Sequence, residues 1–179
     1  LTGDKLTTTD GSKLSSATKM SQLGYTGSGS FTMTKGDGTT TSFSISENTT
    51  IDQLTTGLTN AGLNANFDSS NGRIYVSAKT TGTAAGFSFS GDTAALDALG
   101  LNNTSNKVAG SNAKITLNGV DYESNSNAFT INGMTITVKG KTGTDEELSL
   151  STDTDYDKIY DNIRNFFKEY NTLVNEMDS

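Results

Sequence analysis

The sequence predicts an α+β fold that is mostly β, with two small antiparallel β-rich head domains and a long C-terminal helix. Short alternating apolar runs joined by tight turns fill most of residues 31–138, which is the pattern of β-hairpins. Residues 156–177 instead carry apolar residues at helical spacing. Only 32% of the 179 residues are hydrophobic, below the roughly 45–50% of average globular domains, so we expect thin cores and sheets with one wet face.

The first β-rich domain is predicted for residues 19–103, and it begins with a hairpin. Phe31 and Met33 alternate with Thr, a Gly-rich turn follows, and Phe43 and Ile45 alternate with Ser on the return. A short helix near residues 50–61 comes next, because capping Asn and Thr side chains precede an apolar i, i+3, i+7 pattern that a Gly ends.

The same domain continues with a second hairpin and a trailing helix. Asn71-Gly72 joins two alternating runs, which is a strong hairpin signal. Phe87 and Phe89 mark a further strand, and Asp92 can cap a short helix that follows it. The order is therefore ββαββ with one more strand and a small helix.

The second β-rich domain is predicted for residues 104–152 together with 1–18. Two hairpins are indicated by Asn-Gly turns at Asn118 and Asn132, and Leu148 and Leu150 predict a closing strand. If residues 1–18 add a strand here, the first domain is an insertion into the second. The similar starts of the two domains leave an internal repeat open as an alternative.

Composition excludes several classes of function. The net charge is −7, which disfavours binding to nucleic acid or to an anionic membrane, and no apolar run approaches the roughly 20 residues of a membrane span. The chain has no Cys and no His, so the commonest general base and the commonest metal ligands are missing. We therefore expect no enzyme activity, no metal and no cofactor. Because Leu1 is not an initiator Met, we also expect the chain to be an excerpt.

An acidic run before the helix could be mistaken for a calcium loop. Asp153, Asp155 and Asp157 match the first half of an EF-hand, but the sixth and twelfth places hold Lys158 and Arg164 where Gly and Glu are needed. Helix capping and favourable charge at a helix N-terminus explain these residues better.

A second acidic run, Asp145, Glu146 and Glu147, is interpreted as a solvated loop rather than an acid pair for sugar chemistry. The many Ser and Thr hydroxyls fit either the wet face of a sheet or a carbohydrate-tolerant secreted surface, and the sequence does not separate these two.

The C-terminal helix carries a heptad seam, and its residues are the predicted partner-helix or oligomer interface. The seam residues recur at spacings of 4, 3, 4, 3, 4 and 3: Tyr156, Tyr160, Ile163, Phe167, Tyr170, Val174 and Met177. Ile159, Phe166 and Leu173 widen it on one side. The 3.5-residue period favours bundle or coiled-coil packing over the alternative of an ordinary amphipathic helix that docks on the head.

The C-terminal segment resembles the bacterial flagellar filament cap family, known as FliD or hook-associated protein 2. The resemblance lies in residues 153–159 (DTDYDKI) and 166–174 (FFKEYNTLV), where an Asp-rich start leads into a helix with a Phe-x-x-Tyr-Asn-x-Leu core. Residues 115–119 (ITLNG) and 129–136 (FTINGMTI) resemble the strand-turn motifs of the head domains of flagellins and cap proteins.

Residues 49–54 (TTIDQL), followed by 71–74 (NGRI), are similar to a repeat in the same proteins. The resemblance implies a head fragment with the start of a helical leg at residues 153–179, since the long terminal helices of the family and the leg's partner helix are absent from this sequence.

The resemblance also implies a role. Such a protein caps the filament tip outside the cell, is exported by the flagellar apparatus, and promotes flagellin polymerisation. Its implied partners are copies of itself in a ring-like homo-oligomer, flagellin, and a host surface glycan or mucin, with no nucleic acid and no membrane. Two alternatives stay open: the variable outer region of a flagellin or hook-junction protein, and a secreted adhesin or glycan-binding module.

Overall fold

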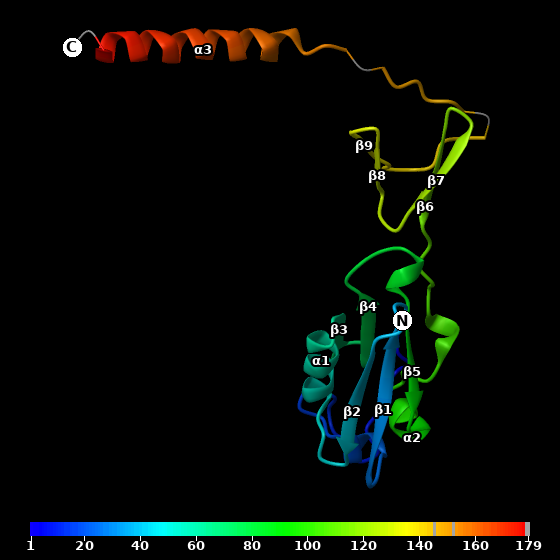
Figure 1. Cartoon of the computed structure of the whole chain (residues 1–179). Coiled ribbons are helices and arrows are strands. Elements are labelled where there is room, and N and C mark those ends of the chain that lie inside the picture. Colours follow the sequence, from blue (N-terminus) through cyan, green and yellow to red (C-terminus); the bar gives the residue numbers. More distant parts are fainter. Residues whose placement is uncertain (145, 152, 178–179) are drawn as a thin grey trace. The chain divides into compact units, whose positions relative to one another are not determined.

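The computed structural model describes residues 1–144, 146–151 and 153–177. The chain divides into two compact units, Leu1–Lys139 and Gly140–Ser179. The first unit holds short antiparallel sheets with small helices, and the second holds one long helix (Figure 1). The predicted α+β, mostly β fold class is confirmed.

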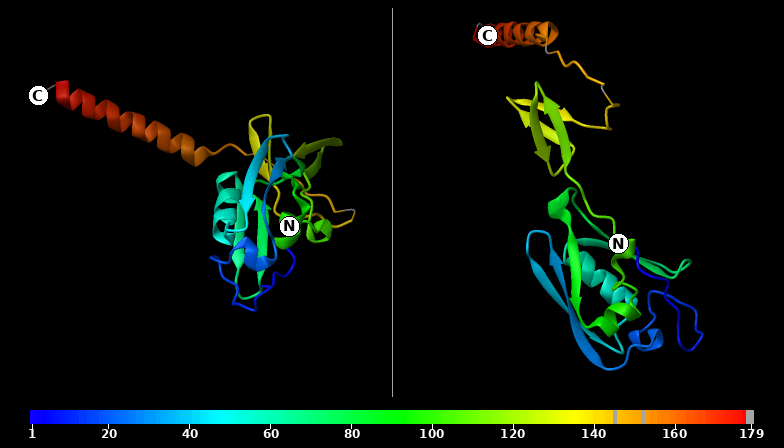
Figure 2. Two further views of the ribbon diagram at one scale, coloured as in Figure 1. Left: turned by 90° about the horizontal axis from the view of Figure 1, so that it is seen from below. Right: turned by 90° about the vertical axis from the view of Figure 1, so that its right-hand side faces the viewer.

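A three-stranded antiparallel sheet forms one layer of the first unit. Its strands are β1 (Ser28–Lys35), β2 (Thr40–Ser46) and β5 (Phe87–Gly91), in the order β2-β1-β5. The helix α1 and the hairpin β3–β4 lie on one face of this sheet (Figures 1 and 2). The alternation of the sequence therefore sends Phe31 and Met33 into the core and the neighbouring Ser and Thr to the opposite face.

The helix α1 (Ile51–Asn60) leads into β3 (Leu63–Asp68) and β4 (Arg73–Ala78). A capping box opens α1: Thr50 Oγ1 accepts from the Gln53 N–H at 3.3 Å, and Gln53 Oε1 accepts from the Thr50 N–H at 3.0 Å. Ile51, Leu54 and Leu58 of α1 are buried. The predicted helix and the hairpin that follows it are both present.

The core of the first unit is built around aromatic rings. Phe31 stacks on Phe43 with ring centroids 5.1 Å apart and meets the edge of Phe89 at 5.7 Å. The buried residues of this core all lie between Leu6 and Leu101. The short helix α2 (Thr93–Ala98) begins at the predicted cap, and the 3-10 turns η1 (Met20–Leu23), η2 (Thr83–Ala85) and η3 (Thr104–Asn106) connect these elements.

The N-terminal segment lies against β4. The Gly3 N–H donates to the Ile74 carbonyl at 2.8 Å and the Leu6 N–H donates to the Gly72 carbonyl at 2.7 Å, while Leu6 is buried. The sequence suggested that residues 1–18 extend the second β-rich domain. These contacts are instead with the first hairpins, and they arise because Leu6 completes the apolar layer beside Ile74.

Two further hairpins complete the first unit: β6 (Ala113–Leu117) with β7 (Val120–Ser124), and β8 (Ala128–Ile131) with β9 (Met134–Thr137). Their turns place Asn118 at φ 51° and Asn132 at φ 48°, each followed by a Gly with positive φ, as two-residue type I′ turns require. Phe129 is the buried hydrophobic residue of this stretch, 4% exposed. Isolated hairpins with so little burial are marginal in water.

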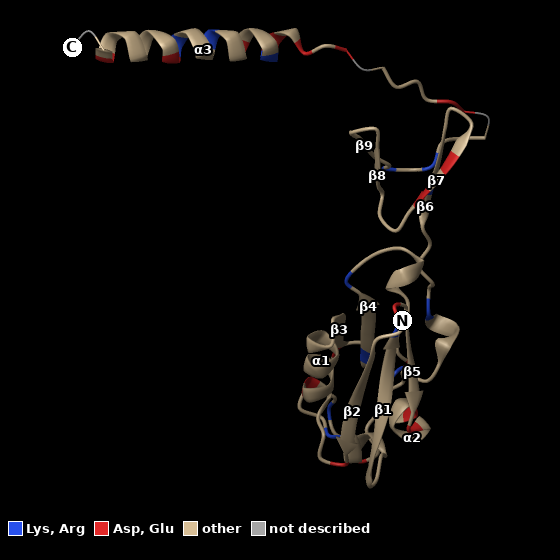
Figure 3. Ribbon diagram, viewed as in Figure 1, with Lys and Arg blue, Asp and Glu red and all other residues tan. Residues whose placement is uncertain are grey.

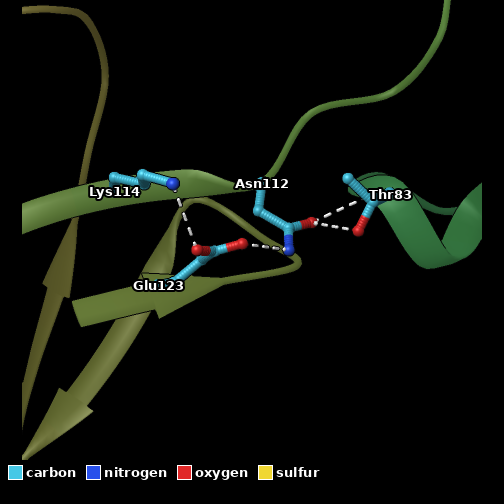
Figure 4. A network of polar contacts seen from close by, with 4 residues as sticks. All are labelled: Thr83, Asn112, Lys114 and Glu123. Carbon is cyan, nitrogen blue, oxygen red and sulfur yellow. Dashed lines mark hydrogen bonds and ion pairs between the residues drawn. The ribbon is translucent and has the colours of Figure 1, made fainter.

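A polar link joins η2 to the β6–β7 hairpin (Figure 4). Asn112 Oδ1 accepts from the Thr83 backbone N–H at 2.7 Å and from its hydroxyl at 3.2 Å, and Asn112 Nδ2 donates to Glu123 Oε1 at 2.7 Å. Lys114 pairs with the other oxygen of Glu123 at 3.3 Å. These bonds anchor the hairpin through residues that lie far apart in the sequence.

The second unit is an extended segment followed by α3 (Tyr156–Met177). The closing strand predicted from Leu148 and Leu150 is wrong: the described residues 146–151 contain no strand, and both leucines are exposed. Alternation alone does not make a strand, because the backbone must also find a partner to pair with.

Candidate functional site: an exposed face on the C-terminal helix

The start of α3 is fixed by a side-chain cap. Asp155 Oδ1 accepts from the Lys158 N–H at 2.9 Å, which satisfies one of the free donors of the first turn. Asp157 lies in that turn, where negative charge is favourable. Asp153 accepts from the neighbouring Thr154 N–H at 2.8 Å. The capping interpretation is therefore confirmed for Asp155.

The described residues contain no group of three or more acidic side chains that could hold a metal ion. The other acidic run is also exposed: Glu146 Oε2 accepts from the Gly143 N–H at 2.6 Å, which closes a local turn. Asp145 lies outside the described residues. None of the helices in the described ranges combines the length and apolarity needed to cross a bilayer.

The structure brings all seven predicted seam residues onto one face of α3. With 3.6 residues per turn, the seam and the flanking residues Ile159, Phe166 and Leu173 cover about 140° of the circumference. Charged side chains of both signs occupy the rest of the helix (Figure 3). This is the strongly two-sided pattern of a helix that packs on one side.

The whole apolar face of α3 is exposed. Exposed fractions run from 41% at Val174 to 80% at Met177, and no residue of the helix is buried. Phe166 and Phe167 touch each other edge to face at 5.6 Å. A helix of 22 residues gains most of its stability from packing such a face, so α3 presents an unsatisfied packing surface about 33 Å long.

The face is wider than a simple two-helix seam. Tyr156, Ile163, Tyr170 and Met177 form a central column at seven-residue steps, with the columns that begin at Ile159 and Tyr160 on either side. In heptad terms these are positions a, d and e. Two overlapping seams share the central column, which suits packing against more than one neighbouring helix.

Sequence reasoning missed two polar features of the first unit. The Tyr25 hydroxyl donates to Asp92 Oδ2 at 2.7 Å, and this bond lowers the pKa of Asp92 and raises that of Tyr25. The hydrogen bond from Asn112, with help from Lys114, lowers the pKa of Glu123. Neither set of partners is close in sequence, so no local pattern announced them.

Comparisons with known proteins agree on one group. Residues 110–179 match the family described as the flagellar hook-associated protein 2 C-terminus. Among solved structures, the chain is similar to the crystal structure of the D2-D3 domains of the flagellar cap protein FliD from Serratia marcescens. The identity is 25%, 81% of this chain and 88% of that chain are covered, and the TM-score is 0.58. Among curated proteins, none matches the sequence.

Proposed function

We propose that this chain, a fragment of a flagellar cap protein (FliD), helps to close the filament tip and promotes flagellin polymerisation by self-association and by contact with flagellin. The role is structural rather than catalytic. It would be performed outside the cell at the end of the flagellum, after export by the flagellar secretion apparatus.

The observation that carries this proposal is the exposed face of α3. A side that offers Ile163, Phe167 and Tyr170 at more than half exposure does not suit a helix that works alone in water. We assign it to a helical leg that begins near residue 153 and packs with other helices in the assembled cap. The seven seam residues are the proposed interface.

The head is proposed to comprise an outer domain, residues 19–103, and a second domain formed by 104–152 with 1–18. The hydrogen bonds of Gly3 and Leu6 to the β4 hairpin favour counting the first residues with the outer domain. The paired hairpins β6–β9 would then form the thin part of the head next to the leg.

The proposal is tested on the full-length protein. Its oligomeric state is measured by light scattering, and its position on purified filaments is imaged by electron microscopy with a label on the protein. We expect a closed ring-like oligomer bound at filament ends. A strictly monomeric species that leaves filament ends bare would overturn the proposal, and binding along filament sides would instead favour a flagellin-like role.

A glycan or mucin contact is a second candidate, favoured by the outer face of the β2-β1-β5 sheet. Ser30, Thr32, Ser42, Ser44 and Ser90 are among the hydroxyl residues on that face. Binding of the head to immobilised mucin, lost when Ser30 and Ser44 are replaced by Ala, would support it. Equal binding by the wild type and this variant would count against it.

A further inference from the structure

The strand β2 is an open edge of the three-stranded sheet. It pairs with β1 alone. The bonds from the Glu47 N–H to the Gly27 carbonyl at 3.0 Å and from the Lys35 N–H to the Thr39 carbonyl at 2.8 Å set the alternation of the antiparallel ladder. By that alternation the backbone groups of Thr40, Ser42 and Ser44 point away from β1.

These outward backbone groups are accessible and unpaired. Thr40, Ser42 and Ser44 are all exposed, and within the described part of the chain no hydrogen bond is recorded for their outward N–H and C=O groups. The opposite edge of the sheet is shielded, because the Phe87 carbonyl accepts from Lys107 and the Gly86 carbonyl accepts from the Gly36 N–H at 2.6 Å. The open backbone edge of this sheet is therefore β2.

The devices that usually protect an edge strand are missing from β2. Residues 40–46 (TTSFSIS) contain no charge and no Pro, and seven consecutive residue pairs join β2 to β1 without a bulge. Figure 3 shows β2 free of charged residues along its length. A long, regular and uncharged edge of this kind is a template for pairing with another strand.

We propose that β2 pairs antiparallel with β2 of a second copy of this chain. Centring the two-fold axis on Phe43 places Ser42 opposite Ser44 of the other copy, twice, and each pair can exchange both of its backbone hydrogen bonds. Phe43 then faces its own copy across a non-hydrogen-bonded pair, where side chains are closest.

Charge supports a second copy as the occupant and selects this register. The chain carries a net charge of −7, so two copies repel least where an edge carries no charge. In the proposed register Glu47 lies opposite Thr39. Moving the axis to Ser42 would place Glu47 opposite Asp37, and like charges directly opposite are unfavourable.

The test separates this contact from association through α3. Both arms use the full chain with Ile163→Ser and Phe167→Ser, and sedimentation equilibrium measures self-association over a concentration series. Ser42→Lys places a charge on the open edge, and Ser88→Lys is its matched control on the same sheet face. We expect at least a tenfold weaker association for Ser42→Lys and no change for Ser88→Lys.

A second variant keeps the test decisive if a charge disturbs the fold. Ser42→Pro removes an N–H that pairing with β1 does not use, and Pro is tolerated at such edge positions. Thermal unfolding checks that the sheet is intact. A dimer that persists in Ser42→Pro, or a parent chain that is monomeric at every concentration, overturns the proposal.

The register is tested by a single spin label. Because the chain has no Cys, Thr39→Cys provides a unique attachment point just outside the strand. Eight residues of extended chain separate the two labels in the proposed register, which is roughly 27 Å. A pulsed electron paramagnetic resonance distance near this value supports the pairing, and the absence of any defined distance overturns it.

Discussion

Replacing Ile163 and Phe167 by Ser should weaken association through α3 by about a thousandfold. The two residues are 52% and 57% exposed, so an interface that covers them buries about half of each side chain. Full burial of such a side chain is worth about 1.5–3 kcal/mol, which gives roughly 1 kcal/mol for each. Two side chains on each of two helices then contribute about 4 kcal/mol, and every 1.4 kcal/mol is about tenfold in Kd.

The assay is sedimentation equilibrium of the 179-residue chain carrying Ser42→Lys, which silences the proposed edge contact. The matched control is Asn162→Ser with Asn165→Ser, which changes two uncharged residues on the polar side of the same turns. Far-ultraviolet circular dichroism is recorded on every variant, because Ser has a slightly lower helix propensity than Ile.

Two results would refute the reasoning. Unchanged association of a folded Ile163→Ser, Phe167→Ser variant would show that the face is not an interface. Unchanged association together with loss of the folded head would show that these residues belong to a core, as in the docking alternative. Weaker association of the polar-side control would mean that the effect reports on helix stability rather than on the face.

Three further predictions concern local interactions. Asp155→Ala should cost α3 about 1 kcal/mol and lower its helical circular dichroism signal, whereas Asp155→Asn keeps a capping oxygen and should change little. Tyr25→Phe should lower the free energy of unfolding at neutral pH. Because the bond lowers the pKa of Asp92, its contribution is present above the usual Asp pKa and is lost as pH falls through the lowered value, so urea titrations should show the variants converging in acid; a constant difference would contradict this. Gly110→Ala should lower the melting temperature, because the new Cβ would meet the Gly82 carbonyl; an unchanged melting temperature would show that the backbone can shift there at no cost.

The elements that the sequence predicted well are those fixed by local chemistry. The capped start of α1 at Thr50, the type I′ turns at Asn118 and Asn132, and the start of α3 near Asp155 each depend on residues within one turn of one another. The single apolar face of α3 follows from helical periodicity in the same way. What covers that face is not a local property, and the interface therefore stays a prediction.

The features that escaped prediction all need distant partners. The pairing of β1 with β5, the docking of Leu6 beside β4 and the bond between Thr83 and Asn112 each join segments far apart in the chain. Ser and Thr patterns alternate in many strands of this protein, so alternation alone does not say which strand is the neighbour of which. The false strand at Leu148 has the same origin.

The order of strands in the three-stranded sheet also governs how the chain folds. The hairpins β3–β4, β6–β7 and β8–β9 close over short turns, and such hairpins form in about 1–10 μs. By contrast, β5 reaches β1 only after residues 36–86 have been brought into a closed loop, and non-local pairing of this kind slows folding. The outer edge of β1 is consequently the last to be covered, and Phe31 cannot be sealed from water until Phe89 arrives. In refolding, the slow phase should therefore follow the burial of this ring and not the formation of the hairpins.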